Sequence, residues 1–520
     1  MASKQRPGVT PGRHERMSPV DTAWLRMEGR TDAMSIVSVM TTATPVDAAE
    51  LRRVVATRLL SFPRFRQRPV TDALGASWHE AAEVDLDAHV VTTPLPEPAG
   101  KFELEQLVSR LAGERLDPAR PLWQIHFVER YGEGSAWVLR VHHCYADGTA
   151  MVGVLLSLTE PGAGPANDPT RPDAADRARV ARRSGERPGV PRPLRTWLDQ
   201  LSLPASDIVG NVVAEGARLL ESGVHQLFHP ESAANLASQA GGMAAEFARV
   251  LALPDDPVTP LRGELSGHKR VAWSAPLDLA EIRTVGKALG CTVNDVLMAA
   301  IAGALGAHLR EVHGFDTDEL VLRASVPVDL RTPGAPLTLG NRFGLVFVDL
   351  PVGTRHPLHR VFRVHDTTDA LKRSLQPPVT LAVLGVLGLL PAAAQAPAIQ
   401  LFGRKGTLVA SNVRGPDAPV YLCGQRIREL YFWVPQGGSM GIGVSILSYA
   451  GQVFFGIVAD HNLMPEPGRL AERLGPEFER LLLATTVGRL AVGRPRRSKG
   501  VATQSRPRSR RQPKPAAGST

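Results

Sequence analysis

One stretch of this 520-residue chain constrains its fold and chemistry more than any other: a strand-like run that ends in two adjacent histidines. The run over 138–141 leads into His142 and His143, and an Asp-Gly pair at 147–148 precedes an apolar segment. Because successive strand side chains point to opposite faces, one histidine can face a cleft while the other faces the fold behind it. Histidine titrates closest to neutral pH and is the usual general base. The stretch therefore predicts a catalytic base at the end of a strand.

Metal binding is the other chemistry that adjacent histidines can indicate. The spacing His-His-x-x-x-Asp supplies few ligands on one face, and Cys144, Cys291 and Cys423 are scattered without a Cys-x-x-Cys pair. We therefore expect no metal and no cofactor. Three cysteines also give no disulfide framework, which indicates a reducing compartment such as the cytoplasm.

The segments around the histidines predict a hairpin followed by a helix. Strand patterns over 123–130 and 135–141 flank a Gly-rich turn, and 148–158 has a helical pattern. Both halves of the chain mix strands and helices in a similar way, and the length exceeds one ordinary core. We therefore expect an α/β (α+β) fold with two lobes of comparable size.

Changes in composition along the chain predict its division into segments. These are a flexible leader at 1–16, an N-terminal lobe at 17–158, a Pro/Gly/Arg-rich linker at 159–197, a helical connection at 198–260, a C-terminal lobe at 261–490 that includes a strand at 428–434, and a disordered basic tail at 491–520.

The formal net charge of +9 is concentrated at the C-terminus, where residues 494–520 hold nine basic side chains and no acidic one. Such a tail either keeps the protein soluble or contacts an anionic membrane surface. No aromatic side chains interleave with the basic ones, so we expect no nucleic-acid partner. The N-terminus lacks the apolar core of a signal peptide, and we expect a cytoplasmic protein.

Residues 374–402 contain no charged side chain, and 379–390 is apolar apart from Thr380. This apolar run is well short of the roughly 20 residues that a membrane-spanning helix needs, and four prolines interrupt its surroundings. We expect no transmembrane span here. A buried helix, the lining of a lipid channel and an element that dips into a bilayer surface all remain open.

Seven motifs, taken in their order along the chain, resemble the bacterial wax ester synthase/diacylglycerol acyltransferase family. They are Ser18-Pro19-Val20-Asp21, Pro121-Leu122-Trp123, His142 to Gly148, Asn294-Asp295, Gly340 to Gly344, Ser411 to Pro416 and Ser448 to Gly451. Together they cover roughly residues 17–485. The His-His-x-x-x-Asp-Gly motif alone is shared by a wider superfamily that includes carnitine and chloramphenicol acyltransferases and peptide-synthetase condensation domains, whereas the whole ordered set is far more specific.

The resemblance implies two chloramphenicol-acyltransferase-like lobes with mixed sheets and a tunnel between them. A long-chain acyl-CoA enters from one face and the acceptor alcohol from the other. His143 takes the hydroxyl proton as the oxygen attacks the thioester, without an acyl-enzyme, because the thiolate is already a good leaving group.

The resemblance also implies roles for the residues around this base. His142 belongs to the catalytic motif together with His143. Asp147 shapes the turn that orients His143, and Arg331 is the candidate ion-pair partner of Asp147. Gly148 leaves room for the pantetheine arm. Asn294 is a candidate oxyanion donor, or else a plain helix cap. Arg414 stands where proline is common in the family, and it either alters a turn or supplies a cation for CoA phosphates.

Three functions follow from this comparison. The first is acyl transfer from acyl-CoA to diacylglycerol, giving triacylglycerol, or to long-chain alcohols, giving wax esters, at a peripheral membrane or lipid-droplet surface. The second is a non-catalytic lipid-surface protein that retains the fold. The third is a condensation-type acyltransferase with a carrier-protein donor, which the absence of a fused carrier or adenylation domain disfavours. We expect the first.

Overall fold

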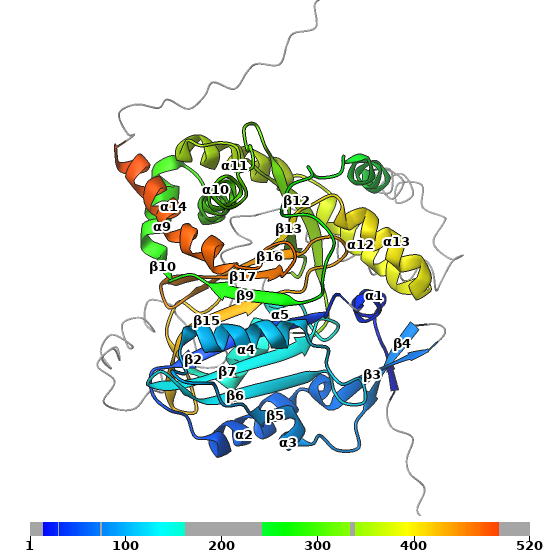
Figure 1. Ribbon diagram of the computed structural model, residues 1–520. Helices are drawn as coiled ribbons and strands as arrows, with labels where there is room; N and C mark the ends of the chain where they lie inside the picture. Colours follow the sequence, from blue (N-terminus) through cyan, green and yellow to red (C-terminus); the bar gives the residue numbers. More distant parts are fainter. Residues whose placement is uncertain (1–13, 30, 73–74, 162–241, 333–337, 488–520) are drawn as a thin grey trace, which may run out of the picture.

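The computed structural model describes residues 14–29, 31–72, 75–161, 242–332 and 338–487. Two seven-stranded sheets, each packed against helices, form two lobes that lie one above the other (Figure 1). Each sheet contains both parallel and antiparallel strand pairs. The predicted two-lobed α/β architecture with mixed sheets is confirmed.

The sheet of the first lobe, drawn at the bottom of Figure 1, is built mainly from the N-terminal part of the chain. In spatial order its strands are β5 (Val90–Thr92), β6 (Trp123–Tyr131), β7 (Gly134–His142), β2 (Ser35–Thr42), β15 (Gln425–Trp433), β14 (Val420–Leu422) and β8 (Glu160–Pro161). The helices of this lobe are α1 (Pro19–Met27), α2 (Ala48–Thr57), α3 (Leu86–His89), α4 (Lys101–Gly113) and α5 (Gly148–Leu158), with short 3-10 turns at Leu59–Ser61 and Pro63–Arg66.

The predicted hairpin places the histidine motif at the centre of this sheet. It consists of β6 and β7, and the other edge of β7 pairs with β2, so that Ser35 lies opposite His142. All nine residues of β7 are buried. A strand that is paired on both edges and covered on both faces has little freedom to move, so its last residue, His142, is held firmly.

The sheet of the second lobe is built from the C-terminal half. Its strands follow the order β10 (Leu277–Asp278), β17 (Gln452–Asp460), β16 (Ile442–Tyr449), β13 (Leu408–Arg414), β11 (Leu322–Asp329) and β12 (Phe343–Leu350), and β9 (Lys269–Trp273) also pairs with β17. The helices are α9 (Leu279–Leu289), α10 (Val293–His313), α11 (Pro357–Leu371), α12 (Gln376–Leu389), α13 (Ala392–Gly403) and α14 (Gly468–Val487).

Two strands from the C-terminal half of the chain, β14 and β15, belong to the sheet of the first lobe. The strand expected at 428–434 is β15, which pairs with β2 of the first lobe so that Trp433 lies opposite Val37. Its assignment to the C-terminal lobe was therefore wrong. Alternation of apolar and polar residues indicates a strand but not the sheet it joins. Here β15 covers an edge of β2 that would otherwise be unpaired.

The ends of the predicted segments also differ from expectation. Residues His14–Arg16, expected in the flexible leader, form β1, which pairs with β4 (Gly75–Glu80), and β3 (Gln67–Asp72) completes this small sheet. Residues 242–252 of the expected helical connection form a helix. The rest of the leader, most of the 159–197 linker, residues 198–241 and the 491–520 tail lie outside the described residues.

The uncharged segment forms two consecutive helices, α12 and α13, at the right of Figure 1. In the described part of the chain, no single helix has the length and apolar character needed to cross a membrane. Only α9 and α10 together meet such a criterion, and a 100° bend separates them.

Candidate active site

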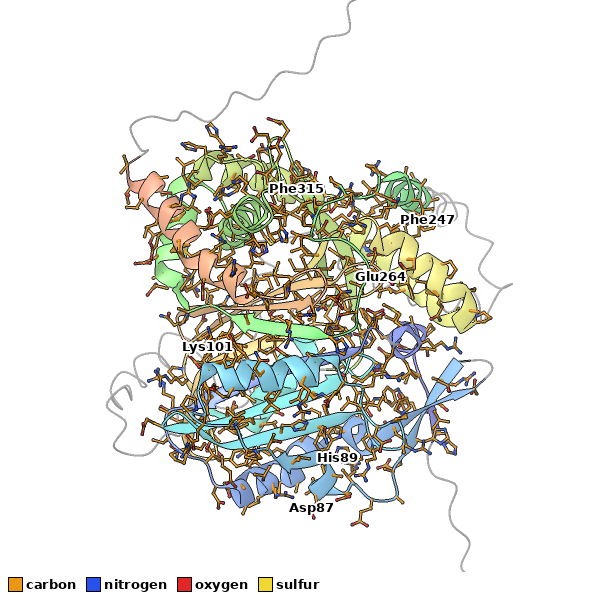
Figure 2. All side chains as sticks on the ribbon, viewed as in Figure 1. Asp87, His89, Lys101, Phe247, Glu264 and Phe315 are labelled. Atoms are coloured by element: carbon orange, nitrogen blue, oxygen red, sulfur yellow. The ribbon has the colours of Figure 1, made fainter. Side chains whose placement is uncertain are left out.

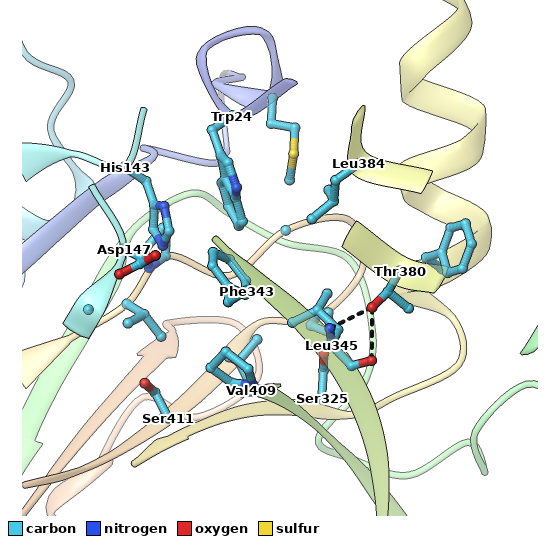
Figure 3. Close-up of a pocket in the computed structure, with 18 of the residues that line it drawn as sticks. Trp24, His143, Asp147, Ser325, Phe343, Leu345, Thr380, Leu384, Val409 and Ser411 are labelled. Atoms are coloured by element: carbon cyan, nitrogen blue, oxygen red, sulfur yellow. Dashed lines mark hydrogen bonds between the residues drawn. The ribbon is translucent and has the colours of Figure 1, made fainter. Parts of the chain in front are cut away.

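The histidine motif opens onto a cavity of about 1570 Å³, counting the open space at its mouth, between the two lobes. The N-terminal half contributes the motif and α1, and the second lobe contributes β11, β12, β13, α12 and α13. Figure 3 shows His143 and Asp147 at one side and Leu384 and Thr380 of α12 at the other. Most of the lining is apolar, including Trp24, Met27, Phe343, Leu345, Phe347, Val383, Leu384, Leu387, Ile399, Phe402, Val409, Val413, Val434 and Met440.

The side chain of His143 lines this cavity and is held by rings on two sides. Its imidazole stacks on the indole of Trp24, with 4.0 Å between ring centroids and 17° between planes. Figure 3 shows the two rings side by side. The ring of Phe343 lies 5.8 Å away. The backbone N–H of His143 donates to the carbonyl of Met34 at 2.7 Å. The base predicted from sequence thus faces an apolar chamber with its orientation restricted.

Burial keeps both histidines of the motif neutral at physiological pH. Desolvation lowers the pKa of His143 to about 4, and the nearby carboxylate of Asp147 offsets part of this effect. Burial likewise lowers the pKa of His142 to about 3, and the adjacent His143 adds to the shift. An unprotonated imidazole is the form that can accept a proton.

His142 does not line the cavity, as expected for consecutive strand side chains. Its side chain is fully buried, and Nδ1 accepts a hydrogen bond from the backbone N–H of Cys144 at 3.1 Å. Its Nε2 lies 3.8 Å from Oε1 of Glu28. These contacts shape the turn that carries His143.

Asp147 is the N-cap of α5, and its side chain also contacts the second lobe. Its Oδ1 accepts the N–H of Ala150 at 3.0 Å, which caps the helix. Its Oδ2 accepts the backbone N–H of Arg342 at 3.0 Å and lies 2.7 Å from Nη1 of Arg331. The structure therefore places Arg331 where the sequence comparison expected the partner of Asp147. A second carboxylate, that of Asp329, lies 3.3 Å from the same nitrogen.

Gly148 and Asn294 occupy different positions relative to the cavity. Gly148 lines it, and a Cβ added there would lie 3.4 Å from Cγ2 of Val413. Asn294 does not line the cavity. Its Oδ1 accepts a hydrogen bond at 3.1 Å from the side-chain amide of Asn412, which does line it. The cap of α10 is Thr292, so the interpretation of Asn294 as a helix cap was wrong.

Sequence reasoning gave no role to a buried pair that supports the motif. The side-chain amide of Asn341 donates to Oδ1 of Asp21 at 2.7 Å and to the carbonyl of His143 at 2.8 Å. The backbone N–H of Gly340 donates to the carbonyl of Tyr145 at 2.9 Å. Asp21 and Asn341 both belong to motifs that carried the family resemblance, and this was the only indication in the sequence that they have a role.

Two other patterns in the described chain could indicate chemistry, and the first of them does not line the cavity. Cys291, Asp295 and His365 place ligand-type atoms within 4.8 Å of one another. However, Asp295 already accepts hydrogen bonds from the backbone N–H of Thr292, from His365 and from Thr368, which stabilise the start of α10. This group is better explained as a structural cluster than as a metal site.

The sequence also contains Gly-x-Ser-x-Gly at 437–441. A nucleophile elbow requires this pattern on a turn between a strand and a helix. Here Ser439 lies in the connection between strands β15 and β16, beside the end of α13. The pattern therefore does not form an elbow.

Comparison with known proteins agrees with this geometry. The family profile described as the wax ester synthase/diacylglycerol acyltransferase catalytic domain matches residues 17–297. The profile of the WS/DGAT C-terminal domain matches residues 339–482. A Mycobacterium tuberculosis protein named "Probable diacyglycerol O-acyltransferase tgs1" is 29% identical over 434 residues, which is 81% of this chain and 84% of that protein.

Solved structures share the fold at lower sequence identity. The wax ester synthase/diacylglycerol acyltransferase from Marinobacter aquaeolei VT8 superposes with a TM-score of 0.62 at 21% identity, over 91% of this chain and all of that one. The first condensation domain of the calcium-dependent antibiotic synthetase gives 0.55 at 15%, over 92% and 97%. The two profile matches decide the assignment: the chain is an acyltransferase and belongs to the wax ester synthase/diacylglycerol acyltransferase family.

Proposed function

We propose that this enzyme transfers a long-chain acyl group from acyl-CoA to the hydroxyl of diacylglycerol, and also to long-chain alcohols, with His143 as the general base. The observation that carries the proposal is the position of His143. Its ring is the unprotonated base of an apolar cavity whose walls come from both lobes. A chamber with a mostly apolar lining suits acyl chains, and exclusion of water protects the thioester from hydrolysis.

The reaction needs only one base. Nδ1 of His143 is buried, so we assign proton transfer to Nε2. As the acceptor oxygen attacks the thioester carbonyl, its proton moves to Nε2. The tetrahedral intermediate then collapses, the C–S bond breaks, and the imidazolium returns the proton to the departing thiolate. A base with a low pKa holds the proton only briefly, which favours its transfer to the thiolate.

The negative charge on the intermediate's oxygen requires a donor. We propose the side-chain amide of Asn412 for this role in place of Asn294, because Asn412 lines the cavity. Asn294 then acts as a positioning residue through its hydrogen bond to Asn412. Asp147 and Arg331 hold the turn, and Gly148 and Arg414, both at the cavity, are left for contacts with the pantetheine arm and the CoA phosphates.

The enzyme assay uses radiolabelled palmitoyl-CoA with diolein or hexadecanol as acceptor. The wild-type chain is expected to label both products, and His143→Ala to lower turnover by about 10²–10⁴-fold. Unchanged turnover in His143→Ala would reject the base. Labelling that occurs only with a carrier-protein donor would favour the condensation-type alternative, and a complete lack of transfer would favour a non-catalytic lipid-surface protein.

Water-insoluble acceptors also suggest where the protein works. We propose a peripheral association with a membrane or lipid droplet, to which the nine basic residues of 494–520 contribute about 1 kcal/mol each when near an anionic surface. Deleting 494–520 is expected to weaken sedimentation with anionic vesicles, and equal sedimentation would remove the tail from the proposal.

A further inference from the structure

Helices α12 and α13 expose an apolar surface on the outside of the second lobe. Val386 and Leu389 of α12 are 58% and 57% exposed, although most large apolar side chains of the described chain are buried. Apart from Gln400, the exposed residues that continue this surface along the helical hairpin of α12 and α13 are small or apolar. With these two, they define the hairpin surface: Val386, Leu389, Pro391, Ala393, Ala394, Ala396 and Pro397.

A helix near the start of α12 also exposes apolar side chains. The helix over 242–252 exposes Phe247 and Leu251, at 39% and 37%, and Figure 2 shows Phe247 on the same side of the molecule as α12 and α13. Ser374, just before α12, donates to Glu246 of that helix at 3.1 Å. The helix that carries Phe247 and Leu251 therefore lies beside the start of α12.

The charges around the hairpin surface match an anionic lipid layer. No charged residue occurs between Arg373 and Arg404, and these two exposed arginines bracket the hairpin. Each lies near one exposed carboxylate, that of Asp369 at 3.3 Å and that of Asp255 at 3.6 Å. Exposed pairs of this kind are weak and screened by salt, so both guanidinium groups remain able to meet phosphate head groups.

The opposite side of the same helices forms the wall of the cavity. Val383, Leu384 and Leu387 of α12 and Ile399 and Phe402 of α13 line it. One pair of helices therefore separates the outer apolar surface from the chamber that holds His143.

Helix α1 connects this wall to the catalytic base. A Cβ added to Gly388 of α12 would lie 1.6 Å from the carbonyl oxygen of Pro19, so the two helices approach closely at a glycine. Nη1 of Arg26 donates to the carbonyl of Leu390 at 2.7 Å. The same α1 carries Trp24, which stacks on His143.

We infer that the hairpin surface docks onto an anionic phospholipid layer and that the acceptor passes from this layer into the cavity behind α12 and α13. This inference rests on the proposed function for the identity of the acceptor. A lipid layer is favoured over a protein partner because an uncharged hairpin bracketed by arginines matches an apolar interior beneath anionic head groups.

The test compares the wild-type chain with two matched double variants. Val386→Asp/Leu389→Asp places carboxylates on the hairpin surface. Val487→Asp/Leu483→Asp makes the same changes at exposed positions of α14, where these side chains are 72% and 63% exposed. Vesicle binding is measured by sedimentation with phosphatidylglycerol–phosphatidylcholine vesicles and with phosphatidylcholine alone. Acyl transfer from palmitoyl-CoA is measured with vesicle-embedded diolein and with dissolved 1-hexanol.

The hairpin variant is expected to bind anionic vesicles at least about tenfold more weakly, because buried apolar area and basic charge together set such affinity. Its turnover ratio of diolein to hexanol should fall by a similar factor, while the α14 variant stays within about twofold of wild type on both measures. Wild-type binding to phosphatidylcholine alone should be weaker than to the anionic vesicles, because the bracketing arginines then lack partners.

Undiminished vesicle binding by the hairpin variant would overturn the inference. An equal loss of turnover on both acceptors would also overturn it, because this would indicate damage to the chemistry. A wild-type oligomer that becomes a monomer in the variant, without a change in vesicle binding, would instead assign the surface to contact with a second copy and overturn the inference. If the wild-type chain acylates neither acceptor, the proposed function fails, whereas the binding comparison still decides the docking.

Discussion

The indole of Trp24 stacks on the imidazole of His143 with 4.0 Å between their centroids. The two residues come from different elements, α1 and the turn after β7, so the contact exists only in the folded lobe. A flat apolar partner restricts rotation of the ring and removes water from one of its faces. This restriction matters because a base contributes only when its nitrogen meets the reacting proton.

Replacing Trp24 by leucine should therefore lower kcat by about tenfold or more through misplacement of the base. Trp24→Phe, which keeps a stacking ring, should recover most of the activity. Steady-state kinetics with palmitoyl-CoA would show this as a change in kcat at nearly constant KM. If leucine and phenylalanine were equally active, the stack would have no part in positioning His143.

Removing the amide of Asn412 tests the oxyanion assignment. Asn412→Ala should reduce kcat by about 10²-fold, as loss of one such donor does in other acyl-transfer sites. Asn294→Ala should reduce it less, since Asn294 reaches the cavity only through Asn412. The reverse order of effects in single-turnover measurements would return the donor role to Asn294.

The ion pair between Asp147 and Arg331 should matter for stability because both side chains are mostly buried. Asp147→Asn retains a good helix cap but leaves Arg331 without one of its two carboxylates, so we expect a loss of about 3 kcal/mol in the free energy of unfolding. Asp318→Asn, which breaks an exposed pair with Arg355 of similar length, should cost less than about 1 kcal/mol. Urea unfolding followed by circular dichroism compares the two variants, and equal losses would contradict a special role for the buried pair.

Gly148 offers a way to separate folding from substrate clearance. In the substrate-free protein a Cβ at this position makes only ordinary contact with Val413, and alanine favours a helix over glycine. Gly148→Ala should therefore fold at least as stably as wild type. Its KM for acyl-CoA should rise several-fold if the pantetheine arm passes here. An unchanged KM would show that the arm takes another path.

Stability should fall in acid because of the two motif histidines. Burial lowers their pKa values from 6.5 to about 3 for His142 and about 4 for His143. Below about pH 6.5 the unfolded chain takes up protons that the folded chain does not. The stability present above that pH is thus lost progressively as the pH falls toward 4 and then 3.

His142→Asn should reduce this dependence by about one proton between pH 6.5 and 4. Asparagine can still accept the N–H of Cys144 through its side-chain oxygen. The slope of the unfolding free energy against pH, taken from urea titrations at several pH values, measures the effect. An identical slope in the variant would mean that His142 is not buried in its neutral form.

Much of this architecture was predictable because it depends on local sequence. The hairpin before the motif, the helix after it and the two-lobed α/β class follow from periodicity, turn residues and length. That His142 and His143 face different sides follows from the alternation of strand side chains, whereas the choice of His143 as the base came from the motif comparison. The motif comparison added the expectation that Arg331 pairs with Asp147, a contact that the structure contains at 2.7 Å.

Other features were decided by packing between segments that are distant in sequence. Local pattern does not reveal that β15 crosses to the first sheet, that Trp24 stacks on His143, or that Asn341 bonds to both Asp21 and the motif. Asn294 has the right chemistry for a donor, but whether it lines the cavity depends on where the packing of the second lobe places the start of α10. The sequence alone determined which groups could do the chemistry, and the tertiary structure decided which of them meet, because contact depends on how separate elements pack and not on the pattern within each one.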